Sequence, residues 1–142
     1  MRKTAELKIK RRNLEEVRKA VSNIKDEKGN SLEPKIKDLV IGFQIWGIPT
    51  IMACEGHDDG WSYPWLTIPF KYLKETARIL RQWNYCQGPQ NPINPVIWII
   101  DPRAEPLIRP LLGKSLRALQ EDAIKFGFFL QNLTKDFDWS KD

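Results

Sequence analysis

The chain is poor in cysteine and histidine: its 142 residues include two cysteines, Cys54 and Cys86, and a single histidine, His57. Two thiols are too few for a disulfide framework, and we expect both to be reduced. No apolar run approaches the about 20 residues that cross a membrane, and the N-terminus lacks an apolar stretch of signal-peptide length. We therefore expect a cytoplasmic protein without a membrane partner.

The overall composition is typical of one folded domain that spans residues 1–142. Hydrophobic residues make up 42% of the chain and charged residues 29%, as in ordinary soluble globular proteins. This length is sufficient for a sizeable core. We found no convincing internal repeat that would divide the chain.

The net charge of +5 is concentrated near the N-terminus. Residues 39–142 carry eleven basic and eleven acidic side chains, so the whole excess lies in residues 1–38. A basic arm over residues 1–12 can hold the phosphates of a nucleic acid. No aromatic side chain is interleaved for base stacking, which favours a solvated arm, and alternation over residues 5–9 is compatible with a short edge strand. The arm includes Lys8, Lys10, Arg11 and Arg12.

Four segments show helical periodicity. Asn13 and Ser31 are good N-caps for the first two, and Gly47 with Pro49 ends the second. Ser115 opens the last helix, whose apolar side chains recur every three or four residues and either cover a sheet or mediate a homodimer. A monomer and a homodimer are therefore both compatible with the sequence. The first three helices are predicted at residues 14–27, 32–46 and 71–84.

Four short segments predict strands, at residues 50–54, 65–70, 96–100 and 107–112. The first is apolar and expected to be buried, and the third is apolar on both faces, which predicts the central strand. Pro69 either places the second strand at or near an edge or ends it there, and Pro106 with Pro110 confines the fourth to an edge. The order of elements predicts an α+β two-layer sandwich, with a mainly antiparallel sheet of about four strands and helices on one face.

The rarest residues gather in residues 47–61, where an apolar strand meets a glycine-punctuated loop. Cys54 is expected at the strand end, and Gly56 permits a turn that brings His57 to the same side. Three chemistries are then open: a thiolate nucleophile, a transition-metal site completed by a neighbouring aspartate, and acid–base catalysis. The usual second pair of metal ligands is missing, so no metal is assigned. A buried thiol beside an exposed loop histidine is the structural alternative.

Aromatic side chains after the loop, and two arginines further along, complete the candidate site. Indole rings can wall a pocket and stack on a ligand ring, and guanidinium groups can bind an anion. The predicted catalytic residues are Cys54, Glu55 and His57. The predicted ligand-binding residues are Asp58, Asp59, Trp61, Trp65, Arg103 and Arg109. These residues predict an enzyme or binding protein for a small polar or nucleotide-like ligand, with no cofactor assigned; the alternative is a nucleic-acid or protein-partner module that uses the basic arm.

Three runs of this chain together resemble a pattern found in small bacterial and phage proteins. They are Gly47-Ile48-Pro49-Thr50, Ala53-Cys54-Glu55-Gly56-His57 and Tyr63-Pro64-Trp65-Leu66-Thr67-Ile68. Those proteins carry a helix, a Gly-x-x-Thr turn, a Ser/Ala-Cys-x-Gly-His segment and a strand. The resemblance implies that the loop is a family hallmark and supplies no activity. A more distant likeness is to the wybutosine-synthesising tRNA methyltransferase family, whose Ser-Cys-x-Gly segment is matched only in part.

Overall fold

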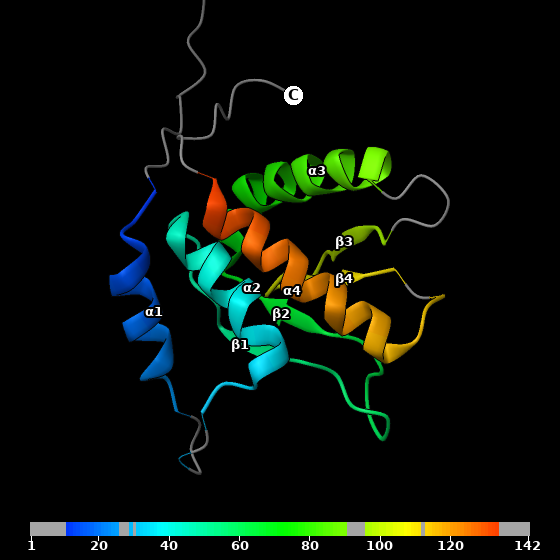
Figure 1. Ribbon diagram of the computed structural model, residues 1–142, viewed down its shortest axis with the longest axis horizontal. Helices are drawn as coiled ribbons and strands as arrows, with labels where there is room; N and C mark the ends of the chain where they lie inside the picture. The colour runs from blue at the N-terminus through cyan, green and yellow to red at the C-terminus, as the bar shows by residue number, and fades with distance from the viewer. Residues whose placement is uncertain (1–10, 26–28, 30, 91–95, 112, 134–142) are drawn as a thin grey trace, which may run out of the picture.

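A computed structural model of the chain describes residues 11–25, 29, 31–90, 96–111 and 113–133. These residues form the predicted α+β fold with an antiparallel sheet, and the elements follow the expected order (Figure 1). The elements are α1 (Leu14–Ser22), α2 (Pro34–Ile45), β1 (Met52–Cys54), β2 (Trp65–Thr67), the 3₁₀ turn η1 (Phe70–Tyr72), α3 (Leu73–Gln90), β3 (Trp98–Asp101), β4 (Leu107–Pro110) and α4 (Leu116–Asn132). None of the described helices is long and apolar enough to cross a membrane.

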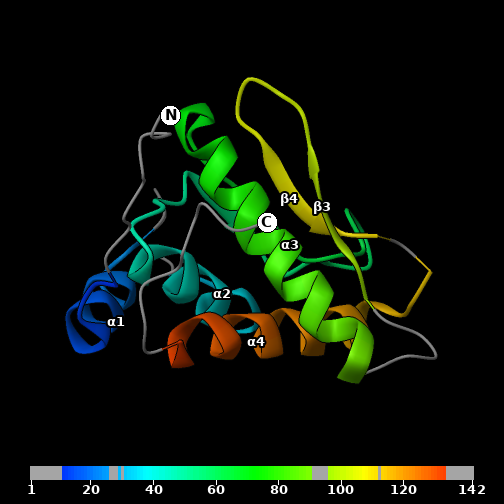
Figure 2. The same cartoon turned by 90° about the horizontal axis from the view of Figure 1, so that it is seen from above.

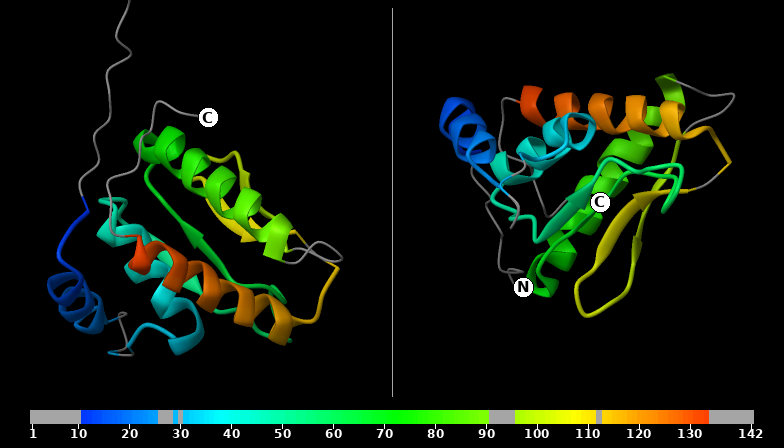
Figure 3. Two further views of the ribbon diagram at one scale, coloured as in Figure 1. Left: turned by 45° about the horizontal axis from the view of Figure 1, so that its top comes forward. Right: turned by 90° about the horizontal axis from the view of Figure 1, so that it is seen from below.

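The strands form one sheet in the order β1-β2-β4-β3, and every neighbouring pair is antiparallel. Helices α2 and α4 pack side by side, α3 runs across β3 and β4, and α1 lies outside α2 (Figure 2). The helices lie on one side of the sheet, which gives two layers (Figure 3). Among the described residues no helix covers the opposite face, so this open face is available to carry a site.

Phe126 of α4 lies at the centre of an aromatic cluster. Its ring centroid is 5.9 Å from that of Phe43 in α2, 5.1 Å from Trp83 in α3 and 5.3 Å from Trp98 in β3. All four side chains are buried, and burying a large apolar side chain stabilises a fold by about 1.5–3 kcal/mol. The cluster thus ties three helices to the helix-covered face of the sheet.

Two glycines allow α2 and α4 to approach closely. A Cβ atom on Gly127 would lie 2.4 Å from the carbonyl carbon of Asp38, and one on Gly42 would lie 2.8 Å from Cβ of Leu130. The Trp46 indole donates to the Leu130 carbonyl across the same contact, at 2.9 Å. The close approach fixes α2, and with it the residues that precede its first turn.

Two helices begin where the sequence predicts. The Asn13 side chain accepts a hydrogen bond from the Glu16 N–H at 3.0 Å, and the Ser115 hydroxyl accepts one from the Ala118 N–H at 3.2 Å. Each bond satisfies a backbone donor that has no partner within the first helical turn. The predicted N-caps of α1 and α4 are therefore confirmed.

The beginning of α2 differs from the prediction. The sequence predicts Ser31 as the cap, but the helix begins at Pro34 with Glu33 at the cap position. Proline suits the first helical position because its ring fixes φ and no backbone donor is needed there. The Lys35 N–H donates to the carboxylate of Glu55 at 3.0 Å, so a distant loop supplies the cap. The Glu33 side chain therefore makes no capping hydrogen bond to its own helix.

Two helices also end at residues other than those predicted. The first is expected to run to residue 27, but α1 ends at Ser22. The third is expected to stop at residue 84, but α3 continues to Gln90. No glycine or proline breaks the helix at residues 85–87, and its last turn includes Gly88 and Pro89, although local rules predict a loop there.

The two strands with nearby prolines lie inside the sheet, not at its edges. β2 is paired with β1 and β4, and β4 is paired with β2 and β3. Pro69 follows the end of β2, Pro106 precedes β4, and Pro110 is the last residue of β4. The prolines therefore flank the hydrogen-bonded ladder without interrupting it. The predicted edge position of β4 is wrong, and for β2 the alternative that the strand ends at Pro69 is the one found, since its last residue is Thr67.

The two edge strands are β1 and β3, which the sequence predicts as buried and central, respectively. Met52 of β1 is 57% exposed. In β3, Trp98 packs into the core, and the Asn84 side chain of α3 bonds both backbone groups of Trp98 at 2.9 Å. β3 is therefore apolar because it packs against the helix layer, and it does not need a neighbouring strand on each side.

Candidate functional site

The loop after β1 is shaped by one glycine. Gly56 has a φ of +89°, and a Cβ atom there would lie 2.7 Å from the carbonyl group of Tyr63. The His57 N–H then donates to the Trp61 carbonyl at 3.0 Å and closes the turn. Cys54 therefore lies at the end of β1 and His57 follows a sharp turn, as the sequence predicts.

An acidic side chain from another segment joins Cys54 and His57. The His57 Nε2 atom lies 2.8 Å from Oε2 of Glu33, whose Oε1 accepts a hydrogen bond from the Glu55 N–H at 2.9 Å. Glu33, Cys54 and His57 each offer one ligand atom, and these atoms all lie within 4.8 Å of one another. We call these three residues the Glu-Cys-His cluster. Its oxygen, sulfur and nitrogen atoms are all donors that transition metals accept.

The environment of Cys54 favours the protonated thiol. Burial is the largest effect and raises its pKa above the ordinary value. The Gly56 N–H, which donates to Sγ at 3.4 Å, lowers the pKa by less than burial raises it, and the negative charges of Glu33 and Glu55 raise it further. A thiolate nucleophile needs a lowered pKa. As the side chains stand, this direction disfavours Cys54 as a nucleophile at neutral pH.

This pKa direction predicts the reactivity of the thiol. With a chelator present, we expect Cys54 to be alkylated slowly by iodoacetamide at neutral pH, and faster only above the ordinary pKa of cysteine. Glu33→Gln removes a negative charge, so it should lower the pKa and speed alkylation several-fold at mildly alkaline pH. Peptide-resolved mass spectrometry across a pH series measures both rates, with Cys86 as an internal reference. A Cys54 rate that is already maximal at neutral pH would contradict the expectation.

The carboxylates of Glu55, Asp58 and Asp59 lie outside the Glu-Cys-His cluster. The Glu55 carboxylate caps α2, and its backbone carbonyl accepts a hydrogen bond from Gln120 of α4 at 3.0 Å. Asp58 and Asp59 are exposed, and neither belongs to the Glu-Cys-His cluster. The structure therefore gives Glu55 a role in positioning the loop between two helices.

The open face of the sheet holds a mainly apolar hollow of about 530 Å³ beside Cys54. Its walls include Trp61 and Trp65, whose ring centroids lie 5.5 Å apart at an interplanar angle of 62°. The guanidinium of Arg103 lies 5.5 Å above the Trp61 ring. We call this hollow the ring pocket. It is lined by Met52, Cys54, Trp61, Trp65, Thr67, Arg103, Ala104, Glu105 and Leu107.

The second predicted arginine has a different role. Arg109 of β4 donates from Nε to Asp101 at 2.7 Å, and its guanidinium lies 5.4 Å from the centre of the Tyr63 ring. Tyr63 in turn stacks on Trp61, with centroids 5.7 Å apart. The charge of Arg109 is thus balanced, and the residue supports the aromatic wall from behind.

One residue of the site, Glu33, escapes sequence reasoning, whereas Tyr63 belongs to the aromatic run after His57 that the sequence predicts as a pocket wall. Glu33 precedes Pro34, and a proline at this place in the sequence predicts only the start of a helix, not a site residue. Its contact with His57 depends on how α2 packs against the end of β1, and no local pattern in the chain encodes that packing.

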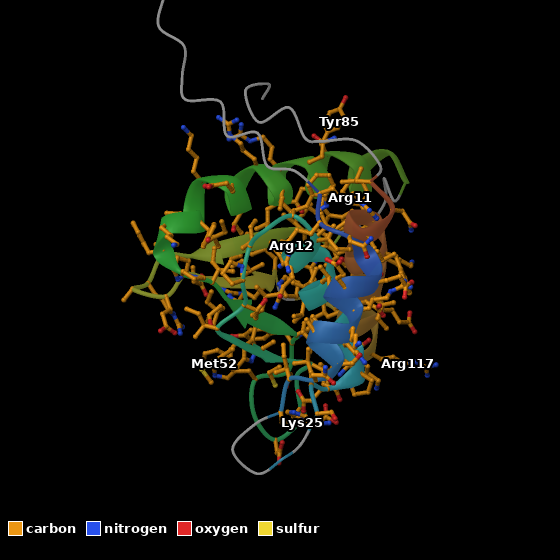
Figure 4. The ribbon with its side chains drawn as sticks, turned by 90° about the vertical axis from the view of Figure 1, so that its left-hand side faces the viewer. Arg11, Arg12, Lys25, Met52, Tyr85 and Arg117 are labelled. Carbon is orange, nitrogen blue, oxygen red and sulfur yellow. The ribbon has the colours of Figure 1, made fainter. Side chains whose placement is uncertain are left out.

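The described part of the basic arm is attached to the fold. The Arg11 side chain donates to the Gln131 carbonyl of α4 at 2.6 Å, and the Arg12 N–H donates to the Ile45 carbonyl at 2.7 Å. Figure 4 shows both arginines at the beginning of α1. Lys8, Lys10 and the strand predicted over residues 5–9 lie outside the described residues. Nucleic-acid binding by the arm and a homodimer through α4 both stay predictions.

Comparison with known proteins gives no further guide to the site. No protein-family model matches the chain, and neither a curated protein nor a solved structure matches it. The resemblance to bacterial and phage proteins at the loop therefore stays a prediction.

Proposed function

We propose that the protein binds a small nucleotide-like ligand, a planar ring that bears an anionic group, in the ring pocket. The observation that carries this proposal is the arrangement of Trp61, Trp65 and Arg103 around one apolar hollow on the open face of the sheet. Ligand pockets typically combine such apolar walls with a few placed polar groups.

The two tryptophans supply a surface for a planar ring. Trp61 is 44% exposed, so part of its indole ring is accessible to a ligand. Trp65 stands at a steep angle to it and continues the wall onto β2. Stacking of a base on an aromatic side chain is worth about 1–3 kcal/mol. A ring ligand therefore gains affinity here that a sugar or an aliphatic acid does not.

The polar groups at the rim suit a nucleotide. Arg103 contacts Trp61 and has no carboxylate partner among the described residues, so its charge is available to a phosphate. The Arg103 side chain is exposed, so it can move away from the Trp61 ring when a ligand ring enters and then lie over that ligand ring. Glu105 also lines the pocket and offers an acceptor to a ribose hydroxyl or a ring amino group. The bound ring would lie beside Cys54, which lines the same pocket.

Isothermal titration with adenosine 5′-monophosphate, adenosine and ribose 5-phosphate tests this proposal. We expect the monophosphate to bind, and the two partial ligands to bind at least about tenfold more weakly, since each lacks one of the two interactions. Trp61→Ala and Arg103→Gln should each weaken binding by a similar factor. Tyr85→Ala and Arg117→Gln are matched controls, because both side chains are exposed and lie away from the pocket (Figure 4).

The proposal fails if none of these ligands, nor the corresponding guanosine and uridine compounds, binds at millimolar concentration. It also fails if binding is unchanged in both pocket variants. Equal weakening by the two control variants would likewise contradict it, because they leave the ring pocket intact.

A further inference from the structure

We infer that the Glu-Cys-His cluster binds a transition-metal ion, with Zn²⁺ as the best match. The inference goes beyond the proposed ring ligand and does not depend on it, because the two sites share only Cys54. The sequence alone supplies two of the ligands, Cys54 and His57. The third, Glu33, is brought to them by the start of α2.

The donor atoms lie close enough together to share one ion. Ligand atoms at about 2.0–2.3 Å from a tetrahedral Zn²⁺ lie roughly 3.5 Å from one another. In the cluster the Nε2 atom of His57 and the Oε2 atom of Glu33 are 2.8 Å apart, and all three ligand atoms lie within 4.8 Å of one another. Side-chain movements of roughly 1 Å, without a change in the backbone, would therefore complete the geometry.

Hydrogen bonds hold the ligands in place. The Glu55 N–H binds the Oε1 atom of Glu33, so the other carboxylate oxygen faces His57. The loop itself is fixed on α2 by the Glu55 carboxylate and on α4 by Gln120, which bonds the Glu55 carbonyl. Hydrogen bonds of this kind to the ligand residues and their backbone orient the ligands in metal sites. The loop is thus held from two helices at the segment that carries the ligands.

Charge and protons balance on binding. Cys54 loses its thiol proton to solvent. The His57 ring proton moves from Nε2 to Nδ1 through solvent, which breaks the hydrogen bond to Glu33 and frees the Nε2 lone pair, and Glu33 binds as a carboxylate. The thiolate and the carboxylate together neutralise a divalent ion. Because a bound metal holds the sulfur as thiolate, ion binding overcomes the burial that otherwise keeps the thiol protonated.

The donor set selects the class of ion. Thiolate and imidazole favour Zn²⁺ and its neighbours over Mg²⁺ and Ca²⁺, which prefer oxygen. The His57 side chain is 48% exposed, so one side of the cluster faces solvent. Three protein ligands with a solvent-facing fourth position are the pattern of catalytic zinc sites, whereas structural sites close the shell with a fourth side chain. The exposed Asp58 and Asp59 do not enter the cluster.

Metal titration of the full chain tests the inference. After treatment with a chelator, we expect the protein to bind one Zn²⁺ per chain, and Co²⁺ to give a thiolate-to-cobalt absorption band in the near ultraviolet. Mg²⁺ should not compete. Glu33→Gln, Cys54→Ala and His57→Gln should each weaken Zn²⁺ binding by at least about tenfold. Asp58→Asn and Cys86→Ser are controls that should bind like the unmodified chain.

Circular dichroism of each variant checks that it folds, and the nearly isosteric Glu33→Gln keeps the test valid if Cys54→Ala does not fold. Absence of stoichiometric Zn²⁺ binding in the micromolar range would overturn the inference. So would binding that survives both Glu33→Gln and His57→Gln, or a cobalt complex without the thiolate band. Trp61→Ala should bind Zn²⁺ normally, so loss of ring binding and loss of metal binding are separable.

Discussion

Replacing Gly127 by alanine is expected to lower the free energy of unfolding by roughly 2–3 kcal/mol. Gly127 lies in α4, where alanine ordinarily stabilises a helix by up to about 1 kcal/mol relative to glycine. At this position, however, the added methyl would lie 2.4 Å from the carbonyl carbon of Asp38 and 2.6 Å from the Leu39 nitrogen, both backbone atoms of α2. The helices must therefore separate, so the packing cost exceeds the gain in helix propensity.

Chemical denaturation monitored by circular dichroism measures this effect. Gly60→Ala is the matched control, because nothing lies within 4 Å of the position of its Cβ atom and its φ is not positive. We expect the control to change the free energy of unfolding by less than about 0.5 kcal/mol. If Gly127→Ala were as stable as the original chain, α2 and α4 would not be in the contact described.

Gly56→Ala should damage both the fold and the site. A φ of +89° is unfavourable for alanine, at about 1–2 kcal/mol, and the methyl would meet the Tyr63 carbonyl and the Leu116 side chain at 2.7 Å. Together these terms predict a loss of roughly 2–4 kcal/mol in the free energy of unfolding. The turn that joins Cys54 to His57 would open, so the folded fraction should also bind Zn²⁺ more weakly.

Two measurements separate these effects. Denaturation gives the loss of stability, and zinc titration well below the unfolding temperature gives the loss at the site. Gly60→Ala serves again as the control within the same loop. A Gly56→Ala chain that is destabilised but binds Zn²⁺ with unchanged affinity would contradict the role of this turn in positioning the ligands.

Local sequence patterns predict the elements of this fold better than their places in the sheet. Asn13 and Ser115 cap helices through bonds to residues three positions away, so both caps can be read directly from the chain. The order of the strands is decided by long-range packing. Pro106 and Pro110 indicate an edge strand by local rules, but at the ends of β4 they remove no donor from the middle of the ladder.

In the candidate site, too, the features set by neighbouring residues can be predicted from the sequence, and those set by long-range packing cannot. The turn at Gly56 between Cys54 and His57 follows from neighbouring residues and is found in the structure. Glu33 reaches them only because Pro34 sets the start of α2 beside the end of β1. Arg103 meets Trp61 because the loop between β3 and β4 folds over the open face, a consequence of a strand order that the sequence does not reveal.

The most direct test of the proposed nucleotide-like ligand is a nuclear magnetic resonance titration of the ¹⁵N-labelled chain with adenosine 5′-monophosphate. The chain has six tryptophans, whose indole N–H signals are well separated from the backbone amides. The Trp46 and Trp98 indoles donate hydrogen bonds inside the core and serve as internal controls. We predict saturable shifts of the Trp61 and Trp65 indole signals, with those two controls unchanged. A titration that leaves the Trp61 and Trp65 signals in place would contradict the proposal.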